Sequence, residues 1–230
     1  MIPSLDSLQY RVLTTADQLS VMPTFEEFIW GGDDERVSVN VLAAVVGEGG
    51  LALAAFDEGE VVASAFAFPT REQGVLHSHY MAVHPEYRGS GLGERMKREQ
   101  AVWCASNGYH AMRWTFDPMQ ITNAHLNLNK LGALGVQYHI DLYGPLGGIN
   151  GSLPSDRLTV QWEMVAPRPA FVESVVLTVP PVSPEQIAAS APEALAARMA
   201  IRDEMAPHLA DGWVVSAVDR HARTYTLSRT

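Results

Sequence analysis

Hydrophobic and polar residues alternate in short runs over most of the chain, a pattern typical of a mixed α/β protein. Strands are predicted at residues 10–13, 51–56, 61–68, 74–83, 111–116, 136–143 and 158–165. Helices are predicted at residues 15–22, 37–45, 92–107 and 122–131. The acidic turn Asp57-Glu58-Gly59-Glu60 joins two of these strands and predicts a β-hairpin.

The composition changes after Val165. Two proline-rich stretches, at residues 166–169 and 179–182, predict stiff connections. Beyond them, strands are predicted at residues 171–179, 213–218 and 224–227, a helix from the capping-box sequence Ser183–Gln186, and a helix carrying Leu195, Met199 and Leu209. We therefore expect one domain over residues 1–166 and a small α/β C-terminal unit over residues 167–230.

Composition narrows the class of protein. The chain of 230 residues is 47% hydrophobic and 18% charged, which predicts a globular protein. Its 26 acidic and 16 basic residues give a formal net charge of −10, which disfavours nucleic acid and anionic membranes as partners. The single cysteine, Cys104, excludes an internal disulfide. No segment has the pattern of a signal peptide or a membrane span, so we expect a cytoplasmic protein.

Arg88, Gly91 and Gly93 lie directly between a predicted strand and a predicted helix. This arrangement places unhindered backbone N–H groups, a helix N-terminus and a cationic side chain at one spot, which favours phosphate binding. Arg95 and Arg98 follow one turn later and are expected to reach phosphates at the rim. Because the positive charge is local, an acidic protein can still bind a diphosphate.

Other glycine-rich phosphate motifs fit this stretch less well. The spacing of Gly89, Gly91 and Gly93 differs from the G-x-G-x-x-G dinucleotide fingerprint, and the Gly-Lys-Ser/Thr of a nucleoside-triphosphate loop is missing from the sequence here. A further alternative is that the glycines only shape a tight strand-to-helix turn.

The stretch from Met81 to Gly93, M-A-V-H-P-E-Y-R-G-S-G-L-G, resembles the strand, turn and helix of the GNAT superfamily, including its Arg/Gln-x-x-Gly-x-Gly/Ala signature. A second stretch, Asn123 to Ala133, looks like the later helix of that family, in which an alanine precedes Lys-Leu-Gly at this spacing. The resemblance covers residues 10–165. The whole chain is similar to a GNAT-related group that carries an added C-terminal unit.

The resemblance implies an α/β, GNAT-like acyl-CoA N-acyltransferase fold, a mixed splayed β-sheet flanked by helices. Acetyl-CoA or another acyl-CoA would lie in the wedge between the strand before the turn and the strand after the long helix. The backbone of Met81, Ala82 and Val83 would hold the pantetheine arm, and Asn123 would contact the pantetheine or the thioester. Amides of the turn would hold the diphosphate: those of Arg88, Gly89, Ser90, Gly91, Leu92 and Gly93.

Acyl transfer to an amine requires a base, a donor for the developing oxyanion and a proton for the leaving thiolate. His79 occupies a strand position that is often acidic in GNAT relatives, and it is our candidate base. Glu99 and Asp117 are weaker candidates. His77 shares the strand face of His79, so the two could bind a metal or be merely packed or solvated, but the spacing reveals no third ligand and we predict no metal. Transfer in the family is usually direct, so Cys104 is not expected to act.

Many GNAT relatives protonate the thiolate with a tyrosine in the later helix, but Leu128 stands at that position here. The proton would then come from Tyr138, from Tyr143 or from no residue, and Tyr138 is our candidate. Asn127 lies one turn from Asn123, so both can face the wedge or simply lie on the helix surface. The pair Asp156-Arg157 is expected to be a surface ion pair or to bind an acceptor carboxylate.

The sequence thus predicts an N-acyltransferase that moves an acyl group, most simply acetyl, from coenzyme A to the amino group of a small molecule. One alternative, favoured by Leu128, is an acyl-CoA-binding module with little or no catalysis, whose C-terminal unit could form a homodimer. Another is N-acetylation of a protein or peptide, which would need an open groove beside the wedge.

Overall fold

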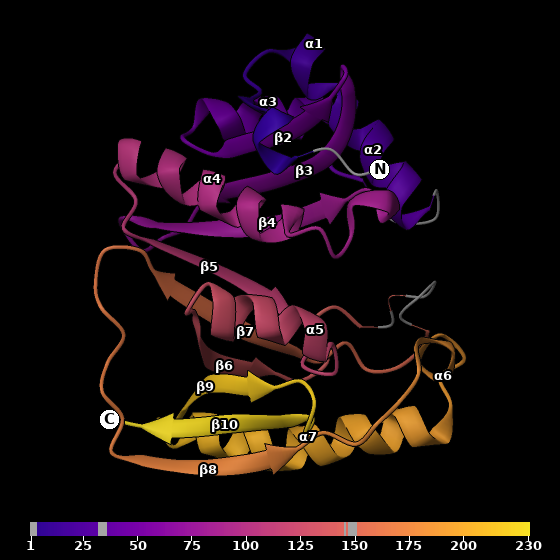
Figure 1. Cartoon of the computed structure of the whole chain (residues 1–230), viewed down its shortest axis with the longest axis vertical. Coiled ribbons are helices and arrows are strands. Elements are labelled where there is room, and N and C mark those ends of the chain that lie inside the picture. Colours follow the sequence, from indigo (N-terminus) through magenta and orange to yellow (C-terminus); the bar gives the residue numbers. More distant parts are fainter. Residues whose placement is uncertain (1–3, 32–35, 145, 147–150) are drawn as a thin grey trace. The chain divides into compact units, whose positions relative to one another are not determined.

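The computed structural model describes residues 4–31, 36–144, 146 and 151–230. The chain divides into two compact units, Met1–Met112 and Arg113–Thr230, and each combines a β-sheet with helices (Figure 1). The glycine-rich loop expected at residues 144–154 lies partly outside the described residues. In the described part of the chain, every helix is too short or too polar to cross a membrane.

The sheet of the first unit is antiparallel and confirms the predicted hairpin. Its strands follow in the order β1 (Gln9–Val12), β2 (Leu51–Asp57), β3 (Glu60–Pro69) and β4 (Val75–Val83). The tight turn between β2 and β3 places Glu58 and Gly59 at φ values of 47° and 98°, the left-handed conformations that suit a two-residue hairpin loop.

Helices cover both faces of this sheet. They are α1 (Ala16–Leu19), α2 (Val21–Trp30), α3 (Val39–Gly47) and α4 (Leu92–Ser106), with 3₁₀ turns at Leu5–Ser7 (η1) and Pro85–Tyr87 (η2). The first three bury Leu19, Met22 and Leu42 against Phe66 of β3. The neighbouring Ala67 points to the opposite face, where α4 packs.

The helix expected to end near Met22 is longer than predicted. A Thr15 capping box begins α1, which ends at Leu19, and α2 then continues the helical path to Trp30. Pro23 lies in the first turn of α2, where the N–H group that proline lacks would have no partner within the helix. Pro23, which in the sequence indicated the end of a helix, is therefore compatible with the start of a second helix.

A buried lysine ties α4 to β4. Lys97 is 3% exposed, and its Nζ donates a hydrogen bond to Ser78 Oγ at 2.8 Å. Gln100 Nε2 donates to the same hydroxyl at 3.2 Å. Desolvation by burial lowers the pKa of Lys97 to about 7. Cys104, two turns beyond Lys97, is completely buried, and burial raises the pKa of its thiol to about 12, as expected for a packed cysteine.

The sheet of the second unit includes the strands that follow Val165. Its order is β5 (Ala111–Phe116), β7 (Arg157–Glu163), β6 (Leu134–His139), β9 (Val214–Asp219), β10 (Thr224–Arg229) and β8 (Glu173–Thr178). Gly135 of β6 pairs with Val215 of β9, and a Cβ on this glycine would lie 2.8 Å from the Val215 Cβ. Only glycine permits this close approach.

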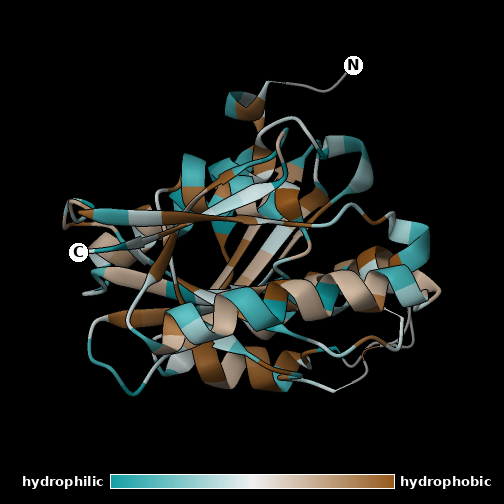
Figure 2. Cartoon of the chain, turned by 90° about the horizontal axis from the view of Figure 1, so that it is seen from below, coloured by the Kyte–Doolittle hydropathy of each residue, from teal (hydrophilic) through white to brown (hydrophobic). Residues whose placement is uncertain are grey.

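The helical elements of the second unit are α5 (Ile121–Ala124), the π-helical turn η3 (His125–Lys130), α6 (Pro184–Ala188) and α7 (Pro192–Ala210). Polar and apolar residues alternate along the helices (Figure 2). The helix predicted to carry Leu195, Met199 and Leu209 is α7, in which Leu195 is 41% exposed whereas Ala194, Ala197 and Ile201 are buried. The small alanines on its buried face let α7 lie close to the sheet. A pattern of large apolar residues in the sequence does not reveal such a face.

Two arginines of α7 anchor the helix within the second unit. Arg198 donates to the Asp117 carboxylate at 2.8 and 3.0 Å, and Arg202 donates to Asp156 at 2.7 and 2.8 Å. The segment after residue 166 is therefore part of the second unit. The boundary predicted at residue 166 separates two segments that were expected to fold as distinct domains. Whether they fold independently stays a prediction.

The strand expected at residues 136–143 is displaced to Leu134–His139. Asp141 adopts a φ of 49°, and its carboxylate accepts a hydrogen bond from the Ser155 N–H at 2.9 Å. This side-chain bond fixes a turn before the predicted strand end, because aspartate tolerates the left-handed conformation and competes with ladder hydrogen bonds.

Replacing Lys97 with methionine is expected to change the pH dependence of stability. Because burial lowers its pKa from 10.5 to about 7, the folded state binds fewer protons than the unfolded state between these values. The wild-type free energy of unfolding should thus rise with pH through this window, relative to Lys97→Met, by roughly 2–4 kcal/mol. Below pH 7 the difference should be constant. Urea denaturation at several pH values measures it, with the exposed Lys130→Met as control; parallel curves for wild type and Lys97→Met would contradict the burial effect.

Candidate active site

A β-bulge in β4 sets the position of His79. Tyr80 pairs with Phe66, and Ser78 pairs with Ala67, so His79 is the extra residue on β4. Such bulges bend a strand and re-aim a side chain. Beyond the bulge, the Tyr80 hydroxyl donates to Glu26 Oε1 at 2.7 Å, and Glu26 is 4% exposed. Burial raises the pKa of both groups, so this bond holds a protonated phenol against α2.

His79 lies on the wall of an apolar groove. The groove has a volume of about 680 Å³ between α3 and strands β3 and β4, and its lining includes Val41, Val45, Phe66 and Phe68. The His79 ring is exposed to this groove, with its centroid 5.6 Å from that of Phe68 and 6.1 Å from that of Phe66. Desolvation by these surroundings lowers the pKa of His79, which favours the neutral imidazole. The predicted base therefore has the protonation state that proton removal requires.

His77 accompanies His79 on the strand, as its two-residue spacing predicts. The ring centroids are 6.2 Å apart, and His77 stacks on Phe68 at 4.8 Å. Among the residues that the structure describes, no cluster of three or more His, Cys, Asp or Glu side chains could hold a metal ion. The geometry thus assigns His77 an aromatic packing contact.

The turn between η2 and α4 presents backbone N–H groups. Gly89 and Gly91 have φ values of 77° and 95°, and Gly91 occupies the N-cap of α4 in the left-handed conformation. The amide of Leu92 donates to Ser90 Oγ at 3.3 Å. Within the described part of the chain, the N–H groups of Gly89, Gly91 and Gly93 donate no hydrogen bond. These amides and the helix dipole supply the kind of donors that an anion needs, so the predicted diphosphate site at this turn stays a prediction that the geometry allows.

Charged side chains around the turn differ in their availability. The Arg88 side chain is exposed. Arg95 pairs with Glu99 at 2.7 Å and with Asp6 at 3.1 Å, and Arg98 pairs with Glu94 at 2.8 Å. These ion pairs occupy the two arginines that we expected at the phosphate rim and also occupy Glu99, a weaker candidate base. Arg88 is thus the better-placed cation for a phosphate.

The backbone of β4 beyond the bulge has one edge paired with β3. The His84 N–H donates to the Val62 carbonyl at 2.9 Å. Because backbone groups alternate in direction along a strand, those of Ala82 also face β3, whereas those of Met81 and Val83 face away from it. This direction is the one that the predicted pairing of Met81 and Val83 with a pantetheine arm requires.

The predicted residues of the later helix lie in α5 and η3 of the second unit. Asn127 is 1% exposed, and its Nδ2 donates to Asn123 Oδ1 at 3.5 Å. Asn123 is exposed. Leu128 is completely buried and packs in the core. The π-helical winding of η3 is a feature that often marks functional sites, and sequence periodicity could not have revealed it.

Tyr138 is held by a buried carboxylate. Its hydroxyl donates to Asp156 Oδ2 at 2.7 Å, and burial raises the pKa of the phenol. Asp156 is completely buried, and its hydrogen bonds with Arg202 and Tyr138 lower its pKa in spite of the opposing effect of burial. Asp156 therefore pairs with Arg202, and the expected surface pair with Arg157 was wrong. The hydroxyl proton of Tyr138 is thus donated to Asp156, and the catalytic role of Tyr138 stays a prediction.

Two buried polar side chains that support these elements, Glu26 and Lys97, were missed in the sequence, and so was Arg202 as the partner of Asp156. Lys97 interrupts the apolar face of α4 and could have been noticed there, since Met96, Gln100 and Cys104 flank it at helical spacing. Asp117, a weaker candidate base, is bound by Arg198. Trp114 of β5 is buried and belongs to the core.

Comparisons with known proteins agree with the fold and the turn. The profile of the Acetyltransferase (GNAT) family matches residues 20–131. The ribosomal-protein-S18-alanine N-acetyltransferase from Escherichia coli superimposes with a TM-score of 0.56 at 16% identity, over 70% of this chain and 96% of that chain. The putative acetyltransferase yncA from Salmonella typhimurium, solved with acetyl-CoA, gives a TM-score of 0.54 at 16% identity, over 71% and 98% of the two chains. The comparison with curated proteins found no match.

These findings confirm the family and the GNAT-like α/β fold expected from the sequence. The matched residues include β4 with its bulge, the glycine turn and all of α4. They also include α5 and η3. The chain therefore contains an acetyltransferase domain of the GNAT family over residues 20–131, and a solved structure with the same fold carries acetyl-CoA.

Proposed function

We propose that this protein transfers the acetyl group of acetyl-CoA directly to the amino group of a small molecule. The observation that carries the proposal is the turn at residues 88–93, where glycine amides without internal partners meet the N-terminus of α4. These groups would hold the diphosphate, with Arg88 beside them and Ser90 shaping the turn. The backbone of Met81 and Val83 would guide the pantetheine arm along β4, with Ala82 bonded to β3 between them.

His79 is proposed to accept the proton of the amine, directly or through a water molecule. The amine nitrogen attacks the carbonyl carbon of the thioester, a C–N bond forms, and the C–S bond breaks as the thiolate leaves. The proton lost by the nitrogen passes to the neutral imidazole of His79. The groove beside His79 would hold the apolar part of the acceptor, because Val41, Val45 and Phe68 line it.

Asn127 and Tyr138 are proposed to serve the thioester end. The buried Asn127 bonds Asn123 and so fixes the amide that would contact the pantetheine or the thioester. Tyr138 could protonate the thiolate, with its hydroxyl oriented by Asp156. A thiolate can also leave without protonation, so positioning could supply much of the rate.

An acyl-CoA-binding module without turnover is the second candidate. The fully buried Leu128 stands where many GNAT relatives have the tyrosine that protonates the leaving thiolate. The two candidates differ in one observable, the release of free thiol from acetyl-CoA. Saturable binding of CoA without thiol release on any amine would favour the binding module.

Substitution of His79 is expected to slow acetyl transfer. In a thiol-release assay with acetyl-CoA and a panel of aromatic, aliphatic and polar amines, His79→Gln should lower kcat/KM by roughly 100-fold on the best acceptor, because the base is lost. Binding of CoA should be unchanged. His77→Gln, on the same strand, is the matched control and should stay within about threefold of wild type. A wild-type rate for His79→Gln would exclude His79 as the base.

The pH profile provides an independent check on the same assignment. Since desolvation lowers the pKa of His79, the neutral base persists to lower pH, and kcat/KM should fall only below about pH 6.5, the usual value for histidine. This acidic limb should disappear in His79→Gln. A limb that is unchanged in the variant would assign it to another group.

Substitution of Gly91 is expected to weaken CoA binding. A side chain at a φ of 95° is strained, and relief of the strain would turn the turn amides away from the diphosphate. Calorimetry should show about a tenfold weaker Kd for CoA with Gly91→Ala. Gly108→Ala is the matched control, because Gly108 has a φ of 81° and open space around it. Equal CoA affinity in Gly91→Ala and wild type would contradict the assignment of the turn.

A further inference from the structure

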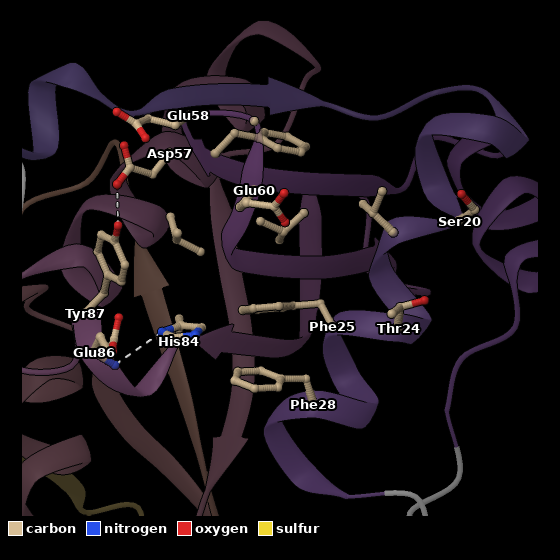
Figure 3. A pocket seen from close by; sticks show the side chains of 15 residues that line it. Ser20, Thr24, Phe25, Phe28, Asp57, Glu58, Glu60, His84, Glu86 and Tyr87 are labelled. Atoms are coloured by element: carbon tan, nitrogen blue, oxygen red, sulfur yellow. Dashed lines mark hydrogen bonds between the residues drawn. The ribbon is translucent and has the colours of Figure 1, made fainter.

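A separate cavity of about 810 Å³ lies within the first unit, beside the end of the β2–β3 hairpin (Figure 3). Its walls come from α2, from the hairpin residues 56–62 and from the segment His84–Tyr87 that leads into the glycine turn. It shares no lining residue with the groove of His79. The cavity is large enough for a small organic ligand.

Aromatic rings form one wall of this cavity. Phe28 of α2 stacks on His84 with ring centroids 5.0 Å apart and an interplanar angle of 13°, and it lies 6.3 Å from Phe25. The Phe28 side chain is 58% exposed. A large ring left exposed and stacked in a cavity offers a flat apolar surface to a ligand.

The charged groups of the lining are carboxylates from two elements. Asp57, Glu58 and Glu60 come from the hairpin and Glu86 from η2, and Figure 3 shows the first three at the hairpin end of the cavity and Glu86 beside His84. The lining contains no lysine or arginine. Among the described residues, none of these carboxylates forms an ion pair. The guanidinium of Arg11 stacks over Phe56 at 4.8 Å, and Arg11 is not a lining residue.

This lining excludes the diphosphate of CoA and selects the opposite charge. Unpaired carboxylates attract a cation, and the faces of aromatic rings attract organic ammonium groups in particular. An ion such as Mg²⁺ prefers a compact octahedron of oxygen ligands and gains nothing from the rings. Carboxylates from two separate elements, with rings beside them, suit a ligand with two ammonium groups joined by an apolar chain.

We propose that this cavity is a binding site for aliphatic diamines and polyamines, distinct from the groove of His79. One ammonium group lies among Asp57, Glu58 and Glu60, the other lies near Glu86, and the aliphatic chain rests against Phe28 and His84. Tyr87, whose hydroxyl donates to Asp57, directly precedes Arg88 of the glycine turn. A ligand here therefore contacts the segment that leads into the turn, and linkage requires any effect on CoA binding to be reciprocal.

Calorimetry on the full chain, without acetyl-CoA, tests the site with 1,5-diaminopentane and spermidine, and with the uncharged 1,5-pentanediol as the matched ligand. We expect saturable binding of both amines at one site per chain and no binding of the diol. The double variant Glu58→Gln/Glu60→Gln should weaken Kd by about tenfold and Phe28→Ala by about fivefold. Asp203→Asn, an exposed carboxylate on α7, is the control and should bind as wild type does.

The proposal would be overturned if neither amine bound saturably up to about 10 mM, a concentration well above typical dissociation constants. It would also be overturned if Asp203→Asn weakened diamine binding as much as the cavity variants do, or if Mg²⁺ at equal concentration displaced the diamine. The far-ultraviolet circular dichroism of each variant is compared with that of wild type, and Phe28 and both glutamates are exposed enough for the variants to fold. Thiol release by the same variants is measured separately. If the cavity variants lose diamine binding but keep normal acetyl transfer, the result supports the cavity site, whether or not the diamine is also an acceptor. If they lose acetyl transfer but keep normal diamine binding, the result contradicts only the proposed acetyltransferase function.

Discussion

The hydrogen bond between Lys97 and Ser78 constrains how α4 lies against β4 in the first unit. It joins α4 to β4 inside the core, and the glycine turn is the short connection between these two elements. Burying an amine is costly, and the lowered pKa of Lys97 records that cost. In return, the N-terminus of α4 is held at a set place relative to the strand, so the amides of Gly89, Gly91 and Gly93 point where a diphosphate can bind.

Charge in this acidic protein is placed locally. The anion site that we propose at the turn relies on backbone dipoles, because the neighbouring Arg95 and Arg98 are paired with glutamates. A few residues earlier, Glu86 and Tyr87 border a cavity rimmed by carboxylates. The segment Glu86–Tyr87 thus lies between the glycine turn, whose amides suit a phosphate, and the cavity, whose carboxylates suit an ammonium group. The net charge of −10 predicts neither of these local environments.

Features that depend on neighbouring residues were predictable from the sequence, whereas features that depend on distant partners were not. The hairpin at Glu58-Gly59 and the turn at Gly91 follow from the conformations that these residues adopt locally. The bulge at His79 arises from pairing with β3, and the bond of Asp156 to Arg202 joins residues 46 positions apart. Local sequence also did not predict that the helix continues after Pro23 or that β6 ends before Asp141. Proline and aspartate each permit more than one local structure, so their distant contacts decide.

Amide NMR spectra of the ¹⁵N-labelled protein test most directly whether backbone groups of the turn bind the diphosphate. Addition of CoA should shift the N–H signals of Gly89, Gly91 and Gly93 to saturation, because each acquires an acceptor. Pantetheine, which has no diphosphate, should leave them in place, and the signal of Gly108 at the far end of α4 should not move with either ligand. Saturation with CoA while the three turn amides stay unchanged would contradict the account.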